Sequence, residues 1–152
     1  MGVTKKVVKN TFQQYVDAQL KDLKAQYIRA LYAAGIETVN YIRNRGAEES
    51  WMDQTGNLRS STGFVLVDDG KVIMQSGFET VKDGAEGSRI GLEFATSLSE
   101  KVEQFRSGLV LIVVAGMEYA SYVEAMDNKD VLASSKPYAN RLVKDLIRDL
   151  HK

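Results

Sequence analysis

Few side chains in this 152-residue sequence have the chemistry and spacing that catalysis needs. The chain contains no cysteine and a single histidine, His151, beside the last residue. A thiol nucleophile is therefore excluded, and a general base or metal ligand is not expected at a chain end, where fraying is usual. A serine triad would lack its histidine. The sequence thus favours a function without nucleophilic catalysis.

Two carboxylate pairs are the remaining candidates for metal chemistry. Asp68 and Asp69 precede Gly70 between two apolar runs, where aspartate is favoured because it hydrogen-bonds to its own backbone. Asp127 and Asp130 lie in the polar stretch "DNKD", and two carboxylates do not fill the oxygen shell of a magnesium or calcium ion. A small metal-dependent hydrolase using Asp127 and Asp130 is the third hypothesis. No metal, cofactor or small-molecule substrate is expected.

Glycines at 84, 87 and 91 precede a helical pattern in "GAEGSRIG". Their spacing fits neither the dinucleotide-binding fingerprint nor the phosphate-binding P-loop. The segment is therefore predicted to be a flexible link, with Ser88 as the residue that caps the following helix.

Charge is balanced over the whole chain but is unevenly distributed. Residues 1–45 hold eight basic and three acidic side chains, a net charge of +5, and the remainder carries −5. Such a division suits head-to-tail contact between copies or contact with a polyanion, and it also suits a solvated helix face. Lys5, Lys6 and Lys9 begin the basic part, so a nucleic-acid-binding accessory protein with a basic helix is the runner-up hypothesis.

Apolar residues mark a long helix between residues 11 and 45. They recur at intervals of three and four and form one stripe. Gly35 falls within the pattern and is a predicted bend or break. At 1.5 Å per residue this helix would be about 50 Å long, so part of it is predicted to project toward a neighbour. The stripe contains Phe12, Tyr15, Val16, Leu20, Leu23, Tyr27, Leu31 and Ala34.

The remaining elements predict a small sheet covered by helices. Asp69 and Gly70 form a hairpin turn between strands at 63–68 and 71–77, and 109–115 is a third, buried strand. A helix is expected from about Ser88 to Gly108, and the last helix from about Pro137. The longest apolar run, 108–117, is far shorter than the roughly 20 residues of a membrane helix, so no membrane contact is expected.

The fold class that follows is α+β, with a long N-terminal helix and further helices packed on a small, mainly antiparallel sheet. We predict one domain over residues 1–152. It would consist of a basic tail at 1–10, the long helix at 11–45 and an α+β body at 46–152 that ends in a helix.

Two short segments suggest a function. The first, "QTGNLRSS" at 54–61, precedes the hairpin, and the second, "GMEYASYVEAM" at 116–126, follows the third strand. Tyr119 and Tyr122 share a helical face, and such tyrosines suit a surface that is half buried in a core corner or against another subunit.

These segments resemble the neck and tail-completion proteins of tailed bacteriophages. That family has a Thr-Gly-x-Leu-Arg-x-Ser segment and then a Tyr-Ala-x-x-Val-Glu segment. The chain matches the first pattern at Thr55, Gly56, Leu58, Arg59 and Ser61, and the second at Tyr119, Ala120, Val123 and Glu124. It departs from the family after Glu124, where Ala125, Met126 and Asp127 replace a Phe-Gly-Thr-like turn.

The resemblance implies a structural virion protein without enzymatic activity. It implies assembly in the host cytoplasm into a ring, a hexamer or dodecamer, at the head-tail junction, beside neighbouring neck, connector or tail proteins and around the path of the genomic DNA. A tail terminator ring is the alternative position. The resemblance assigns subunit or partner contacts to Thr55, Gly56, Leu58, Arg59, Tyr119, Tyr122 and Glu124. Lys5, Lys6 and Lys9 are the basic residues that we would expect to face DNA passing through the ring.

Overall fold

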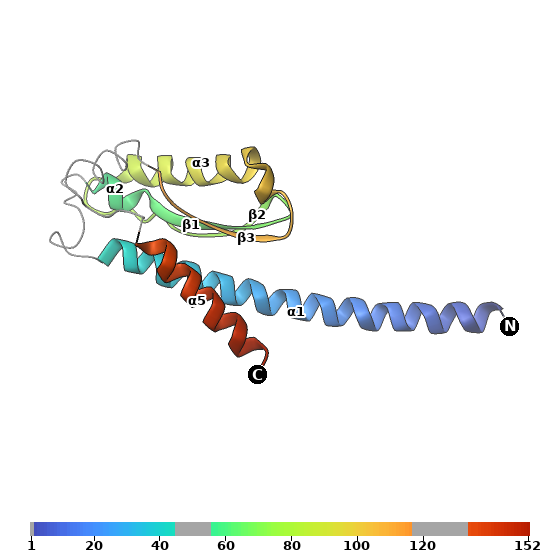
Figure 1. Ribbon diagram of the computed structural model, residues 1–152. Helices are drawn as coiled ribbons and strands as arrows, with labels where there is room; N and C mark the ends of the chain where they lie inside the picture. Colours follow the sequence, from blue (N-terminus) through green and yellow to red (C-terminus); the bar gives the residue numbers. More distant parts are fainter. Residues whose placement is uncertain (1, 45–55, 117–133) are drawn as a thin grey trace.

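The computed structural model describes residues 2–44, 56–116 and 134–152, and for residues 2–10 it describes the backbone alone. Figure 1 shows an α+β body from which one long helix extends. The elements in chain order are α1 (Gly2–Asn44), α2 (Asn57–Ser60), β1 (Thr62–Asp68), β2 (Lys71–Gly77), α3 (Ala85–Lys101), the short 3₁₀ helix η1 (Glu103–Phe105), β3 (Leu109–Ala115) and α5 (Ser135–Leu150). The predicted fold class is confirmed.

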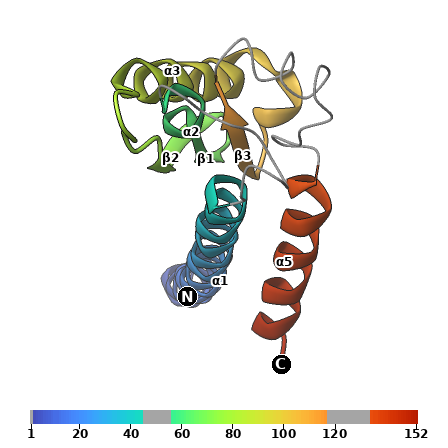
Figure 2. The same cartoon turned by 90° about the vertical axis from the view of Figure 1, so that its left-hand side faces the viewer.

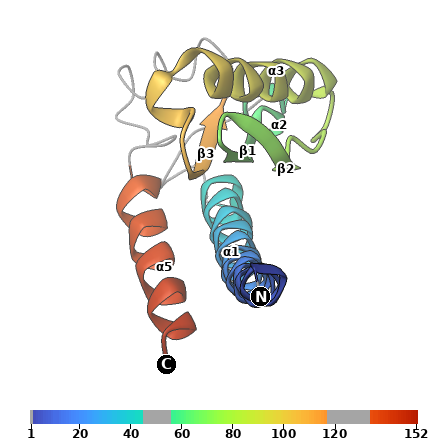
Figure 3. The same cartoon turned by 90° about the vertical axis from the view of Figure 1, so that its right-hand side faces the viewer.

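The body has three layers. The strands form an antiparallel sheet in the order β2-β1-β3. Helix α3 covers one face, and α1 and α5 lie side by side along the other, as Figures 2 and 3 show from opposite sides. Every residue of β1 from Thr62 to Val67 is buried, because this central strand is covered on both faces.

The β1–β2 hairpin turns at Asp69 and Gly70, as predicted. Both residues have positive φ, 48° and 83°, which a type I′ turn requires. The Asp69 side chain also accepts a hydrogen bond of 2.8 Å from the N–H of Gly108. This carboxylate therefore ties the hairpin to the start of β3.

Between the sheet and α3 lies the main apolar core. Its buried members come from the central strand, the edge strand and the helix, and Phe105 of η1 packs against them. The fully or almost fully buried residues are Val65, Val67, Ala95, Ile112 and Val114.

A second apolar layer joins the sheet to the C-terminal half of α1. Phe64 is fully buried there, with its ring 5.4 Å from that of Tyr32 in an edge-on arrangement. A Cβ on Gly35 would lie 2.8 Å from the Phe64 ring. Helix α1 continues through Gly35 without a break, so this glycine provides space for Phe64, and the predicted bend or break is wrong.

The predicted flexible link at 84–91 is also wrong. Gly84, just before α3, and Gly87 and Gly91, within it, are buried and face residues 56–61, because a Cβ on any of them would overlap that backbone. Helix α3 begins at Ala85 after Gly84, so Ser88 is not its cap. The Ser88 hydroxyl instead donates a hydrogen bond of 3.4 Å to the carbonyl of Gly84. Sequence spacing gave no sign of this contact, since the facing residues lie about 30 positions earlier.

The ends of the other helices agree in part with the sequence analysis. Helix α1 begins at Gly2 rather than at residue 11, so the predicted basic tail is helical. Helix α3 ends at Lys101, and Gly108 stands just before β3 with φ of 73°. Pro137 lies in the first turn of α5, as predicted.

Replacing Gly91 tests the close contact of α3 with residues 56–61. In Gly91→Ala the new Cβ would lie 2.7 Å from the Cα of Ser61, so the helix has to move. We expect a loss of about 1–3 kcal/mol in unfolding free energy, typical of overpacking, measured by urea denaturation. Ser97→Ala in the same helix is the control and should stay within about 0.5 kcal/mol. Stabilisation by Gly91→Ala, as helix propensity alone would give, would contradict the contact.

Candidate assembly surfaces

Three of the sequence-predicted contact residues, Gly56, Leu58 and Arg59, lie in or beside α2. Gly56 and Leu58 are buried, Leu58 with 1% of its surface exposed, and Arg59 is half-buried. A contact of this segment with a partner stays a prediction, and Arg59 is the side chain through which the segment would make it. Thr55, Tyr119, Tyr122 and Glu124 lie outside the described residues, as do Asp127 and Asp130 and the side chains of Lys5, Lys6 and Lys9.

Polar side chains of the 56–61 segment fasten the body together. Asn57 accepts a hydrogen bond of 3.1 Å from the N–H of Gly87, in the first turn of α3. Ser60 accepts one of 2.8 Å from the N–H of Val81, and Ser61 donates one of 2.7 Å to the carbonyl of Leu58. Buried polar groups require such partners, so these residues have a structural role in each copy.

The N-terminal part of α1 is the first surface that stands out. We call residues 11–23 the arm, because this part of the helix runs past the end of the body (Figure 1). Its large apolar side chains are exposed, with 67% of Phe12, 64% of Tyr15 and 59% of Leu20 accessible to solvent. The predicted stripe therefore divides into a half that packs on the body and a half that has no cover within the described part of this copy.

An ion pair stands where the arm leaves the body. The Lys24 ammonium lies 2.6 Å from the Asp68 carboxylate at the end of β1. This hydrogen bond, helped by the charge of Asp68 and opposed by partial desolvation, raises the pKa of Lys24 above its ordinary value of 10.5. The pair fixes the helix against the hairpin just before the stripe becomes exposed.

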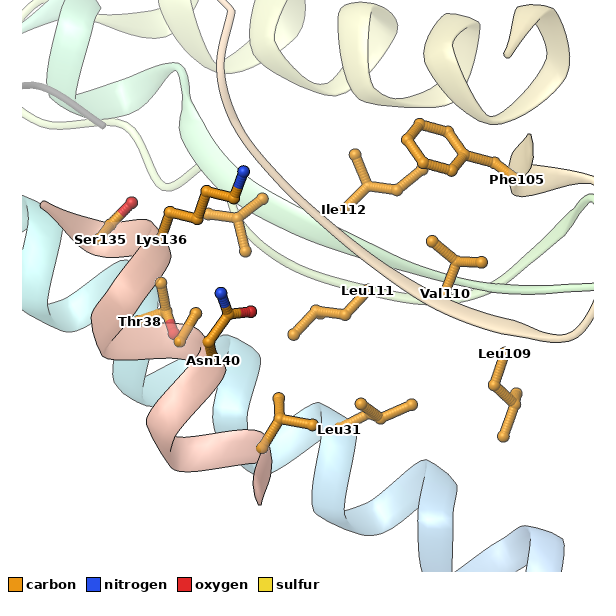
Figure 4. Close-up of a pocket in the computed structure, with 13 residues that line it drawn as sticks. Leu31, Thr38, Phe105, Leu109, Val110, Leu111, Ile112, Ser135, Lys136 and Asn140 are labelled. Carbon is orange, nitrogen blue, oxygen red and sulfur yellow. The ribbon is translucent and has the colours of Figure 1, made fainter. Parts of the chain in front are cut away.

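The second surface is an apolar groove beside β3. It has a volume of about 820 Å³ and lies between β3, α1 and α5. Figure 4 shows Leu109 and Leu111 of β3 above Leu31 of α1, with Asn140 of α5 on the opposite wall. Thirteen residues line it, and only four, Thr38, Ser135, Lys136 and Asn140, carry polar side chains.

The backbone of β3 contributes to this groove. Asp69 N–H donates to the carbonyl of Gly108 and Gly116 N–H to that of Ser61, at the two ends of an uninterrupted register. Alternate residues of an antiparallel pair bond to the partner strand. The even-numbered residues of β3 therefore bond to β1, and the odd-numbered residues point their N–H and C=O groups outward, away from β1. The outward-pointing residues of β3 are Leu109, Leu111, Val113 and Ala115. In the described part of the chain, β1 is the only strand paired with β3.

Helix α5 forms one wall of the groove and is held on α1 by aromatic contacts. The rings of Tyr41 and Tyr138 stack with centroids 4.3 Å apart, and the Tyr27 hydroxyl lies 2.8 Å from Nε2 of His151. Along the groove side of α5, Lys136, Asn140 and Lys144 follow one another at intervals of four and are exposed. The rim of this wall is therefore basic.

The described residues, 2–44, 56–116 and 134–152, contain no cluster of three or more His, Asp or Glu side chains that could hold a metal ion. Asp68 pairs with Lys24, Asp69 with the Gly108 backbone, and His151 with Tyr27. What these ranges offer to a partner is apolar surface.

Comparison with protein-family models, with curated proteins and with solved structures finds no match to this chain. Across the described ranges, no helix combines the length and the apolar character that crossing a bilayer demands.

Sequence analysis found the stripe of the arm but missed the groove. The apolar run 109–115 predicted the strand, and Pro137 predicted the start of α5. Neither signal indicates that α5 and α1 leave room under the edge of β3. A weak signal was the absence of Lys, Pro or any other edge-protecting residue in β3.

The ion pair at the base of the arm predicts a pH effect. Because the folded-state pKa of Lys24 is raised, its contribution to stability is complete below 10.5 and is lost as the pH rises through the folded-state value. The destabilisation by Lys24→Met, measured by urea unfolding, should therefore be seen at pH 7 and shrink above pH 10.5. Lys21→Met, on the arm, should show no such trend. An effect of Lys24→Met that is independent of pH would mean that the charge is not involved.

Proposed function

We propose that this protein is a structural component of the head-tail junction of a tailed bacteriophage, where copies assemble into a ring and dock on neighbouring neck or tail proteins. The observation that carries the proposal is the arm, a regular helix whose apolar stripe is exposed. The neck position is our first choice, and the tail terminator ring is the alternative.

The arm has the properties of a segment that is completed by a partner. An isolated helix of this length is marginal in water, and helices in proteins are stabilised mainly by packing of an apolar face. Phe12, Tyr15 and Leu20 put such a face in solvent. Contiguous exposed apolar surface of this kind marks protein interaction sites.

The proposed location at the head-tail junction rests on the sequence resemblance. The "TGNLRSS" and "YASYVEAM" segments, together with the order of the long helix, hairpin and final helix, are similar to neck and tail-completion proteins. The uneven charge supports a ring, because the basic part of one copy can meet the acidic part of the next in a heterologous contact that closes on itself.

Detection of the protein in virions tests the proposal. We expect mass spectrometry of purified phage particles to find the chain, and electron microscopy to place it in a ring between head and tail. Light scattering of the purified protein, alone and mixed with virion neck proteins, adds the assembly state. A chain that is absent from purified virions and monomeric in every mixture would overturn the proposal.

Substitutions in the arm should separate assembly from folding. Phe12→Ser combined with Tyr15→Ser removes exposed apolar surface, so unfolding free energy should change by less than about 1 kcal/mol. Particle assembly should fail, giving heads and tails that do not join. Gln14→Ser combined with Lys21→Ser, on the other side of the helix, is the control and should yield joined particles. Normal joining with the first variant would exclude the arm as the assembly element.

Contact with DNA is a separable part of the proposal. Lys5, Lys6 and Lys9 stand on the first turns of α1, where they would face the genome. Replacing all three by Ala should weaken duplex DNA binding and reduce the slope of log K against log salt by about 2 to 3, since each phosphate contact contributes about 0.9. The matched control replaces Lys71, Lys101 and Lys152, which are exposed on the body. An equal loss in both variants would mean that binding is diffuse.

A further inference from the structure

The groove beside β3 and the exposed stripe of the arm are both apolar surfaces that the described residues leave uncovered. We propose that the arm of one copy lies in the groove of a second copy, with Phe12, Val16, Leu20 and Leu23 against the neighbour's β3 and α5. The inference deepens the proposed function and rests on it, because it names the contact through which copies assemble.

A copy cannot fill its own groove with its own arm. Helix α1 is continuous from Gly2 to Asn44, and Leu31 of that helix already lines the groove. Phe12 is nineteen residues earlier, about 28 Å away along a straight helix at 1.5 Å per residue. The arm therefore meets a groove only in another molecule.

The arm matches the groove in chemistry and in spacing. Phe12, Val16, Leu20 and Leu23 are separated by four, four and three residues, which keeps them on one side of a helix. The same spacing continues through Tyr27 into the part of α1 that packs on the sheet and on α5 of its own chain. The arm thus offers a neighbour the kind of face that its continuation already uses inside each copy.

The charges around the two surfaces are complementary, because the arm, although it belongs to the basic third of the chain, holds two aspartates and one lysine, a net charge of −1. Lys136 of α5 lines the groove, and by helical spacing the exposed Lys144 follows on the same side of the helix as Lys136 and Asn140, beyond the lining residues. By helical spacing, Asp17 and Asp22 flank the arm stripe on opposite sides. Each of these carboxylates accepts one hydrogen bond from a glutamine four residues away, and a carboxylate has capacity for more. Contact between the lysines beside the groove and the aspartates beside the arm stripe is attractive. Contact between two grooves would bring lysines of like charge together and is therefore less favourable.

The contact uses different surfaces on the two partners, so it leaves one arm and one groove open in a pair. A contact by about a dozen helical residues is smaller than a standard interface of about 1,600 Å². We therefore expect single pairs to dissociate readily. A closed ring gives every copy two such contacts and leaves none unfilled.

Cysteine cross-linking tests the contact, since the chain has no cysteine of its own. One preparation carries Leu20→Cys and a second carries Asn140→Cys; both positions are exposed, and thermal unfolding within a few degrees of wild type confirms that each variant folds. Mixed under mild oxidation, they should form a 20–140 disulfide dimer, because a disulfide requires Cα atoms within about 7 Å. Lys21→Cys mixed with Asn140→Cys is the matched control and should react at least tenfold more slowly.

The other outcomes would overturn the inference. Faster 20–20 linkage would mean that two arms pair with each other, and faster 140–140 linkage would mean that grooves meet, as in pairing of the outer edges of β3. No linkage in solution or in particles that contain the chain would leave the groove to another occupant and spare the proposed function. Failure of the proposed function is a different result, the absence of the chain from virions.

Discussion

The central strand β1 has no face toward water, and the rest of the structure follows from that constraint. A three-stranded sheet cannot bury its middle strand on both sides by itself, so each face needs a helix. Helix α3 covers one face through the apolar core around Val65, Val67 and Ala95, and α1 covers the other around Phe64 and Gly35. Half of α1 is enough for this task. The other half becomes the arm.

The fold was predictable where signals are local. The Asp69-Gly70 turn, the apolar run of β3 and the periodicity of α1 each depend on a few neighbouring residues, and the structure has all three. The glycines of α3 were misinterpreted because they serve a contact with residues 56–61, far away in sequence. The predicted bend at Gly35 was wrong for the same reason, since this glycine leaves space for Phe64, which is also far away in sequence. The sequence alone does not distinguish a glycine that leaves space for a packed neighbour from a glycine that makes the backbone flexible.

The candidate site was predictable only in part for a related reason. Periodicity shows that a stripe is apolar, but it does not show what the stripe packs on, so Phe12 and Ala34 belong to one pattern although one is exposed and the other is fully buried. The groove depends on the angle between α1 and α5, which short-range patterns do not encode. Asn57 and Ser60 lie beside the predicted partner contacts without having been predicted themselves, and they hold α3 and the loop after β2 in place.

The unbroken course of α1 has one more consequence. In the proposed assembly, a single continuous helix joins the body of one copy to its neighbour, so the distance between the two bodies would depend on the number of residues in that helix. Adding or removing residues between Lys24 and Leu20 would change that distance in steps of about 1.5 Å and turn the apolar face by about 100° each time. Insertions or deletions that keep the apolar face directed at the neighbour would therefore have to add or remove close to whole helical turns. The diameter of the proposed assembly would change only in steps of that size.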